Sequence, residues 1–529
     1  MASISLSLPA DYWQSLRVNK KDIEFLHNFL FESETPMTAR ELVGVLIEER
    51  IKAERAAQAK KRQSSGKVYV PKETYSSGDQ LVFPALDWAK GSVTSVRPGV
   101  NPQYGDFAVL TVDLENGGSR MFASGLAEHF LNEEPATDIE ADNIDPQLIQ
   151  TAHGGELETK LEDAFAADEG LVRIAGRWFP RALLVDVNQG HLNLAEAVLD
   201  MAGGEPLPTS ELLKDVELPE GVNPKLAEFS LNLALQEDGR FDEVGPAGEV
   251  LWALQRLEPE NVREVPLFLR YDPIEHDRSL LTKDMLALEA QLDDEFSEAG
   301  TGSGTEAEAV TISLTYPHWR AGTLPITPRV KPLFPTAYES PRVRFTLVDG
   351  KTGERMPAWI VRKYRYVSGL REWYQAIGLM PGSLVTIRRG KKPGEVIIEA
   401  KTHRTTKDWV RTVIVGADGG VVFALLKQTV TAEFNDRMAF ALPALEAADQ
   451  LWEPGQKKRR FDRLVIDVIR ELTKLNPQGH VHAQELFAAV NIMRRVPFAP
   501  LMALLASRPE DFIHVGDLHF RLREDFRED

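Results

Sequence analysis

The stretch WIVRKYRYVSGLREWY, residues 359–374, is the segment on which the predicted fold of the central part of this chain chiefly rests. Its first residues, Trp-Ile-Val, lead into a basic turn at 363–366, and a Gly-Leu pair then precedes a helix. We expect Trp359, Trp373 and Tyr374 to be core residues, because large aromatic side chains contribute most of their free energy when buried.

Positive charge is concentrated around this stretch. The whole chain has 61 Lys and Arg against 80 Asp and Glu, a formal net charge of -19. Between Arg320 and Arg411 the balance reverses, with 19 Lys and Arg against 7 Asp and Glu. Four of the nine tryptophans lie in or beside this basic island: Trp319, Trp359, Trp373 and Trp409. Such an island favours a polyanion, DNA above all, as the partner. The alternative is that the basic face docks on the acidic remainder of the same chain.

Short motifs recur in a fixed order around the same stretch. They are GTLPI (322–326), LFP (333–335), a strand over 343–348 that leads to DGKTG (349–353), the stretch 359–374, and GLMPGSLV (378–385). In this order and spacing, residues 312–400 resemble the DNA-binding pseudobarrel shared by plant B-three transcription factors and the effector domain of some restriction enzymes.

The resemblance implies two loop-rich arms that grip the major groove of duplex DNA. The first arm would present Arg320, Thr323, Arg329 and Lys331, and the second Arg362, Lys363, Arg365 and Tyr366. These residue types suit the task, since Arg can bond two acceptors on guanine and Lys, Arg and Tyr can contact phosphates. The alternative for the arginines is a solvated strand face.

The last part of the chain predicts three helices and a hairpin. Apolar residues recur at helical spacing over 461–475, a second helix carries Leu486, and Pro497 suits the first turn of a third. Phe512 to Leu522 alternates as a hairpin. This order resembles a winged helix. Six cations precede its first and third helices: Lys457, Lys458, Arg459, Arg460, Arg494 and Arg495. They would meet phosphates if the third helix entered a groove, but that helix is mostly apolar, and many winged helices bind only proteins.

Related patterns occur earlier in the chain. Residues 145–190 and 191–260 also read as winged-helix-like units, and Thr38 with Glu41 predicts a capping box at the start of an N-terminal helix. The string TPMTARELVGVLIEE (35–49) resembles the helix-turn-helix module of the bacterial RNA polymerase delta subunit. Residues 77–131 are β-rich, with Asn116-Gly117 marking a hairpin, and fit an SH3- or Tudor-like barrel.

These patterns predict a multi-domain α+β protein with several winged-helix domains, a small SH3/Tudor-like β-barrel and a DNA-binding pseudobarrel. The expected divisions are a helix-turn-helix-like segment (1–70), the small barrel (71–135), winged-helix-like units (136–190 and, with an extension, 191–296), a flexible linker (297–309), the pseudobarrel with a hairpin and helix extension (310–456), and a C-terminal winged helix (457–529).

Catalysis has little support in the residues. The absence of cysteine excludes disulfides, thiolate zinc ligands and cysteine nucleophiles. Glu399-x-Lys401 resembles half of a metal-dependent nuclease site, but no acid lies between Glu372 and Glu395 to hold the metal. We therefore expect no catalytic residue, metal or cofactor.

The sequence thus predicts a non-enzymatic regulatory protein whose partner is double-stranded DNA. No apolar run approaches a membrane span, and the N-terminus does not resemble a signal peptide, so a cytoplasmic, nucleoid-associated protein is expected. One alternative is an accessory factor that binds RNA polymerase or another protein. The second is a defence or restriction-type protein with nuclease activity. The oligomeric state is left open.

Overall fold

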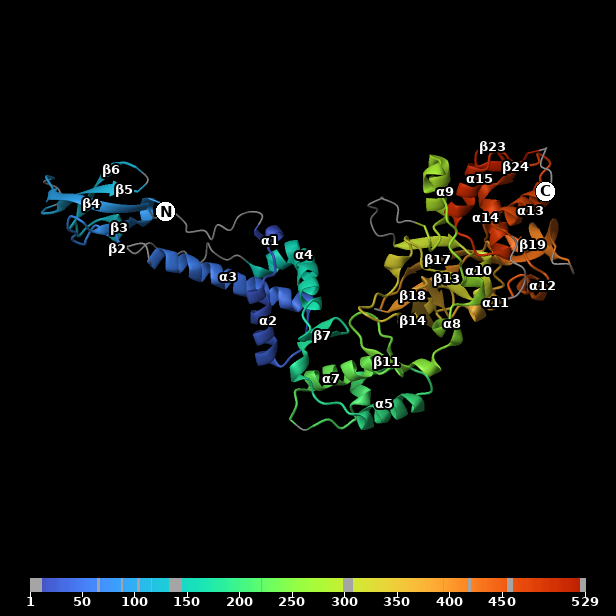
Figure 1. Cartoon of the computed structure of the whole chain (residues 1–529), viewed down its shortest axis with the longest axis horizontal. Helices are drawn as coiled ribbons and strands as arrows, with labels where there is room; N and C mark the ends of the chain where they lie inside the picture. The colour runs from blue at the N-terminus through green and yellow to red at the C-terminus, as the bar shows by residue number, and fades with distance from the viewer. Residues whose placement is uncertain are drawn as a thin grey trace. The chain divides into compact units, whose positions relative to one another are not determined.

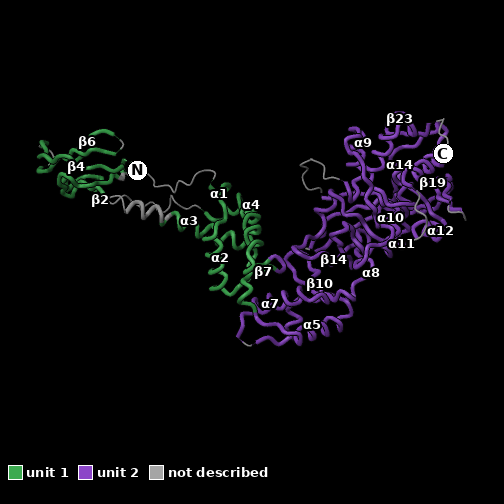
Figure 2. Tube along the Cα trace, viewed as in Figure 1, with its two compact units in different colours: residues 1–173, 177–184 green, residues 174–176, 185–529 purple. Residues whose placement is uncertain are grey.

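The computed structural model describes residues 12–63, 67–86, 89–101, 105–115, 117–132, 145–219, 221–297, 308–392, 394–416, 420–453 and 460–523. The fold mixes helices with several separate sheets, which confirms the predicted α+β class. The chain forms two compact units, the first comprising residues 1–173 and 177–184 and the second residues 174–176 and 185–529 (Figure 2). Asn116, Lys457, Lys458, Arg459 and most of the expected linker, 298–307, lie outside the described residues.

The first unit contains a helical domain closed by a small sheet. Its elements are α1 (Tyr12–Ser15), α2 (Lys20–Ser33), β1 (Met37–Thr38), α3 (Ala39–Gln63), α4 (Pro146–Ala166), β7 (Leu171–Ile174) and β8 (Arg177–Pro180), followed by η3 (Arg181–Leu183). The predicted capping box is present, because the Thr38 N–H donates to the Glu41 carboxylate at 2.7 Å and the Glu41 N–H donates to Thr38 Oγ1 at 3.2 Å.

The segments expected as separate units at 1–70 and 136–190 fold together here. Strand β1 pairs antiparallel with β8, with Met37 opposite Trp178, and α3 packs along α4. A short strand of two residues has no stability alone, so the N-terminal segment completes its sheet with a strand from far along the chain.

A five-stranded sheet lies between α3 and α4 in the sequence. Its strands, in spatial order, are β2 (Lys67–Val68), β3 (Gln80–Phe83), β4 (Ala89–Pro98), β5 (Ala108–Leu114) and β6 (Ser119–Ser124), with the short turns η1 (Pro84–Leu86) and η2 (Phe130–Asn132). Its core is aromatic, with Phe83 and Phe122 stacked at 4.3 Å between ring centroids and Tyr69 beside both.

The second unit begins with another helical domain of the same plan, the middle domain. It consists of α5 (Gln189–Met201), β9 (Leu207–Pro208), α6 (Thr209–Leu212), α7 (Pro224–Glu237), β10 (Phe241–Glu243) and β11 (Leu251–Leu254). Buried Asn232 accepts hydrogen bonds from Thr209 Oγ1 and from Trp252 Nε1, which ties α7 to its neighbours.

Residues 258–297, called the strap below, cross from the middle domain to the C-terminal domain. The strap holds the short helices α8 (Glu260–Arg263), η5 (Leu267–Leu269) and η6 (Arg278–Leu280) and the longer α9 (Lys283–Leu292), after η4 (Gln255–Leu257).

A seven-stranded half-barrel sheet forms the centre of the second unit (Figure 1). In spatial order its strands are β12 (Ala309–Ser313), β17 (Leu384–Arg389), β18 (Glu395–Ala400), β14 (Arg342–Asp349), β15 (Arg355–Val361), β16 (Tyr366–Ser368) and β13 (Thr323–Pro325); α10 (Tyr316–Ala321), η7 (Lys331–Leu333) and α11 (Arg371–Ile377) connect them. Trp359, Trp373 and Tyr374 are buried, as predicted. Gly322 ends α10 at φ 69°, where a Cβ would lie 2.9 Å from the Arg371 backbone, so only glycine fits.

The chain ends in a long two-stranded ribbon and a C-terminal domain. The ribbon is β19 (Thr402–Val415) with β20 (Val421–Ala432), followed by β21 (Phe440–Ala441) and α12 (Leu445–Gln450). The C-terminal domain is α13 (Phe461–Thr473), β22 (Val481–His482), α14 (Ala483–Met493), α15 (Phe498–Ser507), β23 (Phe512–Gly516) and β24 (His519–Leu522), so its three predicted helices and hairpin are present.

Three domains share one sheet arrangement. In each, a two-residue strand lies directly before a helix, which is α3, α6 or α14. This strand pairs with the last strand of the closing hairpin: β1 with β8, β9 with β11, and β22 with β24. A Glu-Leu pair follows each short strand at the same distance, as Glu41-Leu42, Glu211-Leu212 and Glu485-Leu486. The leucine is fully buried each time, so the sequence repeat has a packing cause.

Candidate nucleic-acid interface

Three turns of the seven-stranded sheet lie toward the same end of it. The parallel register pairs Glu395, the first residue of β18, with Thr346 in the middle of β14, so the β17–β18 turn lies on the side where β14 starts. The β15–β16 turn lies beside Arg342 at the start of β14, because β15 runs antiparallel to β14. The segment after β13 joins them, since the Ile326 N–H donates to the Arg365 carbonyl at 2.8 Å. Arg389 closes the group by donating from Nη2 to the Pro332 carbonyl at 2.7 Å.

This end of the sheet carries six exposed cations, called the turn cluster: Arg329, Lys331, Lys363, Arg388, Lys391 and Lys392. Within the described residues, none of the six forms an ion pair. Arg329 interacts electrostatically with Asp293, and Lys392 with Glu395, without forming an ion pair. Exposed cations of this kind are suited to contact phosphates.

Half of the turn cluster escaped the sequence prediction. Arg329, Lys331 and Lys363 were expected in the two arms, whereas Arg388, Lys391 and Lys392 were not. The missed three lie in the string Arg388-Arg389-Gly390-Lys391-Lys392, a glycine turn with two cations on each side. This string is the sequence feature that could have indicated the three missed cations. It has no counterpart among the motifs that carry the resemblance.

Arg362 and Arg365 also lie at this end but shape the turn itself. Arg362 donates to the Ser340 carbonyl at 2.8 Å, and Arg365 donates to the Glu295 carbonyl at 2.8 Å. Arg365 has φ 52°, an uncommon conformation for a residue with a side chain. Both side chains are exposed, so they flank the turn cluster while holding its loops in place.

Two residues assigned to the arms are corrected by the structure. Thr323 has no exposed surface and lies 3.0 Å from His318 Nδ1 through its hydroxyl. Tyr366 is 1% exposed and donates its hydroxyl to the Asn261 carbonyl at 2.7 Å. Every residue of their strands, β13 and β16, is buried, so neither side chain reaches the surface.

Arg320 is engaged by an acid elsewhere in the chain. Its guanidinium contacts both carboxylate oxygens of Asp449, at 2.8 and 2.5 Å, and lies 5.4 Å from the Phe268 ring. A bidentate ion pair of this kind is a strong intramolecular contact. Arg320 therefore joins α10 to α12 instead of presenting a free cation.

The C-terminal cations are placed differently from the prediction. Arg495 is 2% exposed; it donates to Asn491 Oδ1 at 3.0 Å, pairs with Glu295 and lies 5.3 Å from the Phe296 ring. Glu295 also contacts His318 Nε2 at 3.2 Å, and these partners hold the pKa of its carboxyl below the ordinary value despite burial. Arg495 is thus corrected from a DNA contact to a buried structural residue.

The other two described cations that were predicted to meet phosphates in this domain have local partners. Arg494 is half-buried with its guanidinium 5.8 Å from the Phe461 ring, and Arg460 pairs with Asp462 at 2.9 Å. Lys457, Lys458 and Arg459 lie outside the described residues.

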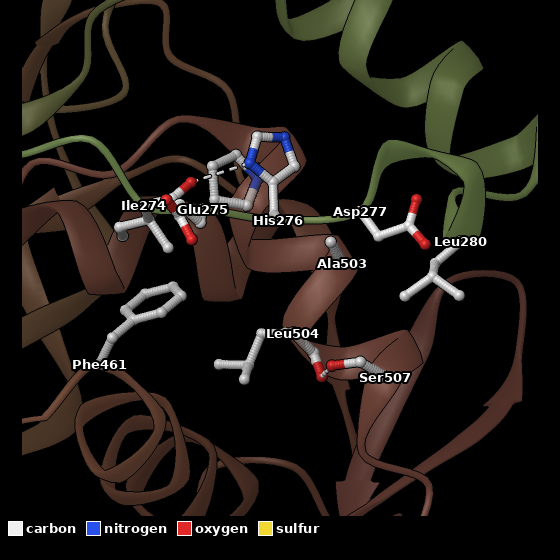
Figure 3. Close-up of a pocket in the computed structure, with 10 residues that line it drawn as sticks. Ile274, Glu275, His276, Asp277, Leu280, Phe461, Ala503, Leu504 and Ser507 are labelled. Atoms are coloured by element: carbon white, nitrogen blue, oxygen red, sulfur yellow. Dashed lines mark hydrogen bonds between the residues drawn. The ribbon is translucent and has the colours of Figure 1, made fainter.

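The strap covers the helix that would have entered a DNA groove. Leu281, Met285 and Leu288 of the strap share one apolar core with α15, and the Phe498 N–H lies 3.4 Å from the Asp294 carboxylate. A cavity of about 240 Å³ remains between the strap and α15. Figure 3 shows Phe461 and Leu504 on one side of it and His276 of the strap on another. Because the strap and the core cover α15, this helix has no exposed face with which to contact DNA bases.

An acidic junction joins the middle domain to the same sheet. Arg342 of β14 pairs with Asp242 and, at 3.1 Å, with Glu258, while the Ser340 hydroxyl donates to Glu243. Burial raises the pKa of Glu243 to about 7, and burial together with Asp242 raises the pKa of Glu258 to about 8. Part of the basic island is therefore neutralised inside the protein, which was the alternative to a DNA partner.

The Glu-x-Lys string has an acid nearby that the sequence reading missed. Asp349 ends β14 opposite Ile398 of the parallel strand β18, next to Glu399. Its carboxylate is occupied, however, by Trp373 Nε1 at 2.7 Å and by the N–H groups of Lys351 and Thr352. Lys401 pairs with Glu433 at 3.0 Å. Across the described residues, no group of three or more acids and histidines is placed to hold a metal ion.

No single helix in the described part of the chain is long and apolar enough to cross a membrane; α14 and α15 pass only as a pair bent by 114°, and both are largely buried in the C-terminal core. Comparison with family models, with curated proteins and with solved structures finds no match to this chain.

Proposed function

We propose that this protein is a non-enzymatic DNA-binding regulator that holds duplex DNA through the turn cluster. The observation that carries the proposal is a set of six exposed cations, none in an ion pair within the described residues, toward one end of one sheet in a chain of net charge -19. Phosphates are the partner of highest charge density that such a surface meets, and the field of the acidic remainder would repel the duplex elsewhere.

The finer fold assignments belong to the same proposal. The sheet with one parallel strand pair and basic turns at one end is what a DNA-binding pseudobarrel requires, and the repeated short strand, helices and hairpin are what winged helices require. In this proposal the winged-helix domains supply protein contacts and spacing, since α15 is covered by the strap and α7 is largely buried.

The test is fluorescence anisotropy of a labelled mixed-sequence duplex with the full chain across a salt series. Reversing three cluster cations, in Arg388→Glu/Lys391→Glu/Lys392→Glu, should weaken binding at least tenfold at low salt and lower the salt slope by about 0.9 for each phosphate that the variant no longer neutralises. The matched control, Lys20→Glu/Lys72→Glu/Lys225→Glu, changes the net charge equally at exposed positions in other domains.

Equal loss in the two triple variants would show that net charge alone controls binding and would reject the cluster. If the unchanged chain shows no duplex binding at low salt, the proposal fails, and binding to RNA polymerase or another protein becomes the function to test.

A further inference from the structure

The long ribbon carries an aromatic and cationic surface that the proposed function does not use. The register of β19 and β20 places Lys407 opposite Thr429, Trp409 opposite Lys427, and Arg411 opposite Leu425, so these side chains share one face of the ribbon. The exposed members, called the ribbon face, are Lys407, Trp409, Leu425, Lys427 and Thr429.

The twist of the ribbon explains why this part of the face is open. Near the tip, Val413 and Phe423 of the same face are buried in the C-terminal core. Near the base, the opposite face is buried instead, with Val410 and Val430 packed against Ala439. A strongly twisted two-stranded ribbon changes the face it presents along its length, and the ribbon face is the stretch turned to solvent.

Trp409 is exposed over 60% of its full area, and Leu425 on the same face is 48% exposed. Lys427 Nζ lies 5.4 Å from the Trp409 ring, and Lys407 lies two residues away on the same strand. Exposed indole surface loses the free energy that burial would supply, so a partner that covers it gains that energy.

The charged residues around Trp409 indicate the kind of molecule that the ribbon face would bind. Lys407 and Lys427 make no ion pair within the described residues. The neighbouring acids are directed elsewhere: Asp408 is on the opposite face, Glu433 pairs with Lys401, and Glu485 pairs with Arg411. A flat aromatic ring flanked by two cations without acidic partners complements a molecule with both π faces and negative charges.

We propose that the ribbon face binds single-stranded nucleic acid, with an unpaired base stacked on Trp409 and phosphates on Lys407 and Lys427. Base–aromatic stacking flanked by cations is the general way in which proteins hold single strands. A duplex would offer phosphates to the lysines but no base face to the indole, because its bases are stacked on each other.

This site goes beyond the proposed function and does not depend on it. Strand β18 starts beside the β17–β18 turn of the turn cluster and ends at Ala400, and the ribbon starts at Thr402, so β18 lies between the two surfaces along the chain. One chain could therefore hold a duplex at one surface and a displaced strand at the other.

The experiment measures binding of the full chain to a labelled oligothymidine of 20 nucleotides and, separately, to a labelled duplex. Trp409→Ala should weaken oligothymidine binding roughly 5- to 100-fold, and Trp409→Phe should retain part of the affinity. Lys407→Glu/Lys427→Glu should lower the salt slope by about 1.4, or 0.7 for each phosphate on a single strand. Unchanged circular dichroism and melting of each variant exclude misfolding as the cause.

The matched control is Val422→Ala, an exposed residue on the other face of the same ribbon, which should bind as the unchanged chain does. The turn-cluster triple variant should lose duplex binding and keep oligothymidine binding, which separates the two sites. The proposal is overturned if the unchanged chain does not bind oligothymidine at low salt, if Trp409→Ala binds it normally, or if Trp409→Ala weakens single-strand and duplex binding equally.

Discussion

The turn cluster and the C-terminal domain were predicted to bind DNA by similar reasoning, and the structure separates them. Both place cations next to an element that could enter a groove. In the sheet, the cations lie on turns and stay exposed, whereas in the C-terminal domain Arg495 points inward and α15 is covered by the strap. The two regions differ in the element next to the cations, which in the C-terminal domain is almost entirely apolar. The ten residues of α15 include one polar side chain, Ser507, so this helix is a core element.

The largest effect that tests this comparison is expected at Arg495. Replacing it in Arg495→Met removes the arginine partner of buried Glu295 and leaves that carboxylate with His318 alone, which costs up to about 3–5 kcal/mol. Hydrogen exchange of the amides in α13–α15 should rise strongly, and the melting temperature of this part of the chain should fall. The neighbouring change Arg494→Met serves as the control, with a much smaller effect because Arg494 is half-buried and has no acidic partner among the described residues.

The distinction between the two regions is contradicted if the Arg495→Met variant keeps the stability of the unchanged chain and loses duplex binding. That result would place Arg495 at a DNA surface instead of in the core.

The acidic junction predicts an intermediate effect with a defined pH dependence. Because the folded protein raises the pKa of Glu243 to about 7, the folded state binds a proton that the unfolded state releases near pH 4.5. The stabilisation by this proton is complete below pH 4.5 and is lost as the pH rises through 7. Glu243→Gln, which imitates the protonated acid, should raise the melting temperature by a few degrees at pH 8 and change it little at pH 5.

Calorimetry at pH 5 and 8 checks this expectation, with Glu249→Gln as the control because Glu249 is exposed in the same loop. Equal stabilisation of Glu243→Gln at both pH values would contradict it. A loss of duplex affinity in this variant at both pH values would show that the junction, and not only the turn cluster, contacts DNA.

The smallest effect is expected for the exposed and half-exposed cations of the C-terminal domain. Arg460→Ala/Arg494→Ala should change duplex affinity less than twofold, since Arg460 pairs with Asp462 and Arg494 lies over Phe461. Lys391→Ala/Lys392→Ala removes the same number of charges from the turn cluster and should weaken binding several-fold. Anisotropy titrations at one salt concentration suffice, and a reversal of this ranking would exchange the roles of the two regions.

Local patterns predicted individual elements well. The stripe over 461–475 became α13 with Leu464, Val468 and Ile469 buried, and the strand at 80–83 and the capping box at Thr38 were found in place. These features depend on periodicity and on contacts between near neighbours, which a sequence displays directly.

Long-range pairing was beyond the sequence reading. Nothing in the residues near Met37 indicates that their strand partner is Trp178, and the partners of Arg320 and Arg495 lie 129 and 200 residues away. Thr323 and Tyr366 lie on strands whose residues are all buried, and Tyr366 packs against Val262 and Leu269 of the strap, a long-range contact that the local sequence does not display.

The insertion of the five-stranded sheet between α3 and α4 has a consequence for synthesis of the protein. Strand β1 ends at Thr38, but its partner strand begins at Arg177. At a translation rate of about 5–20 residues per second, the residues of β1 are synthesised on the order of ten seconds before those of its partner strand β8. The inserted sheet, complete by Ser124, is synthesised entirely within this interval. The first domain to begin emerging from the ribosome is therefore completed after the one it encloses.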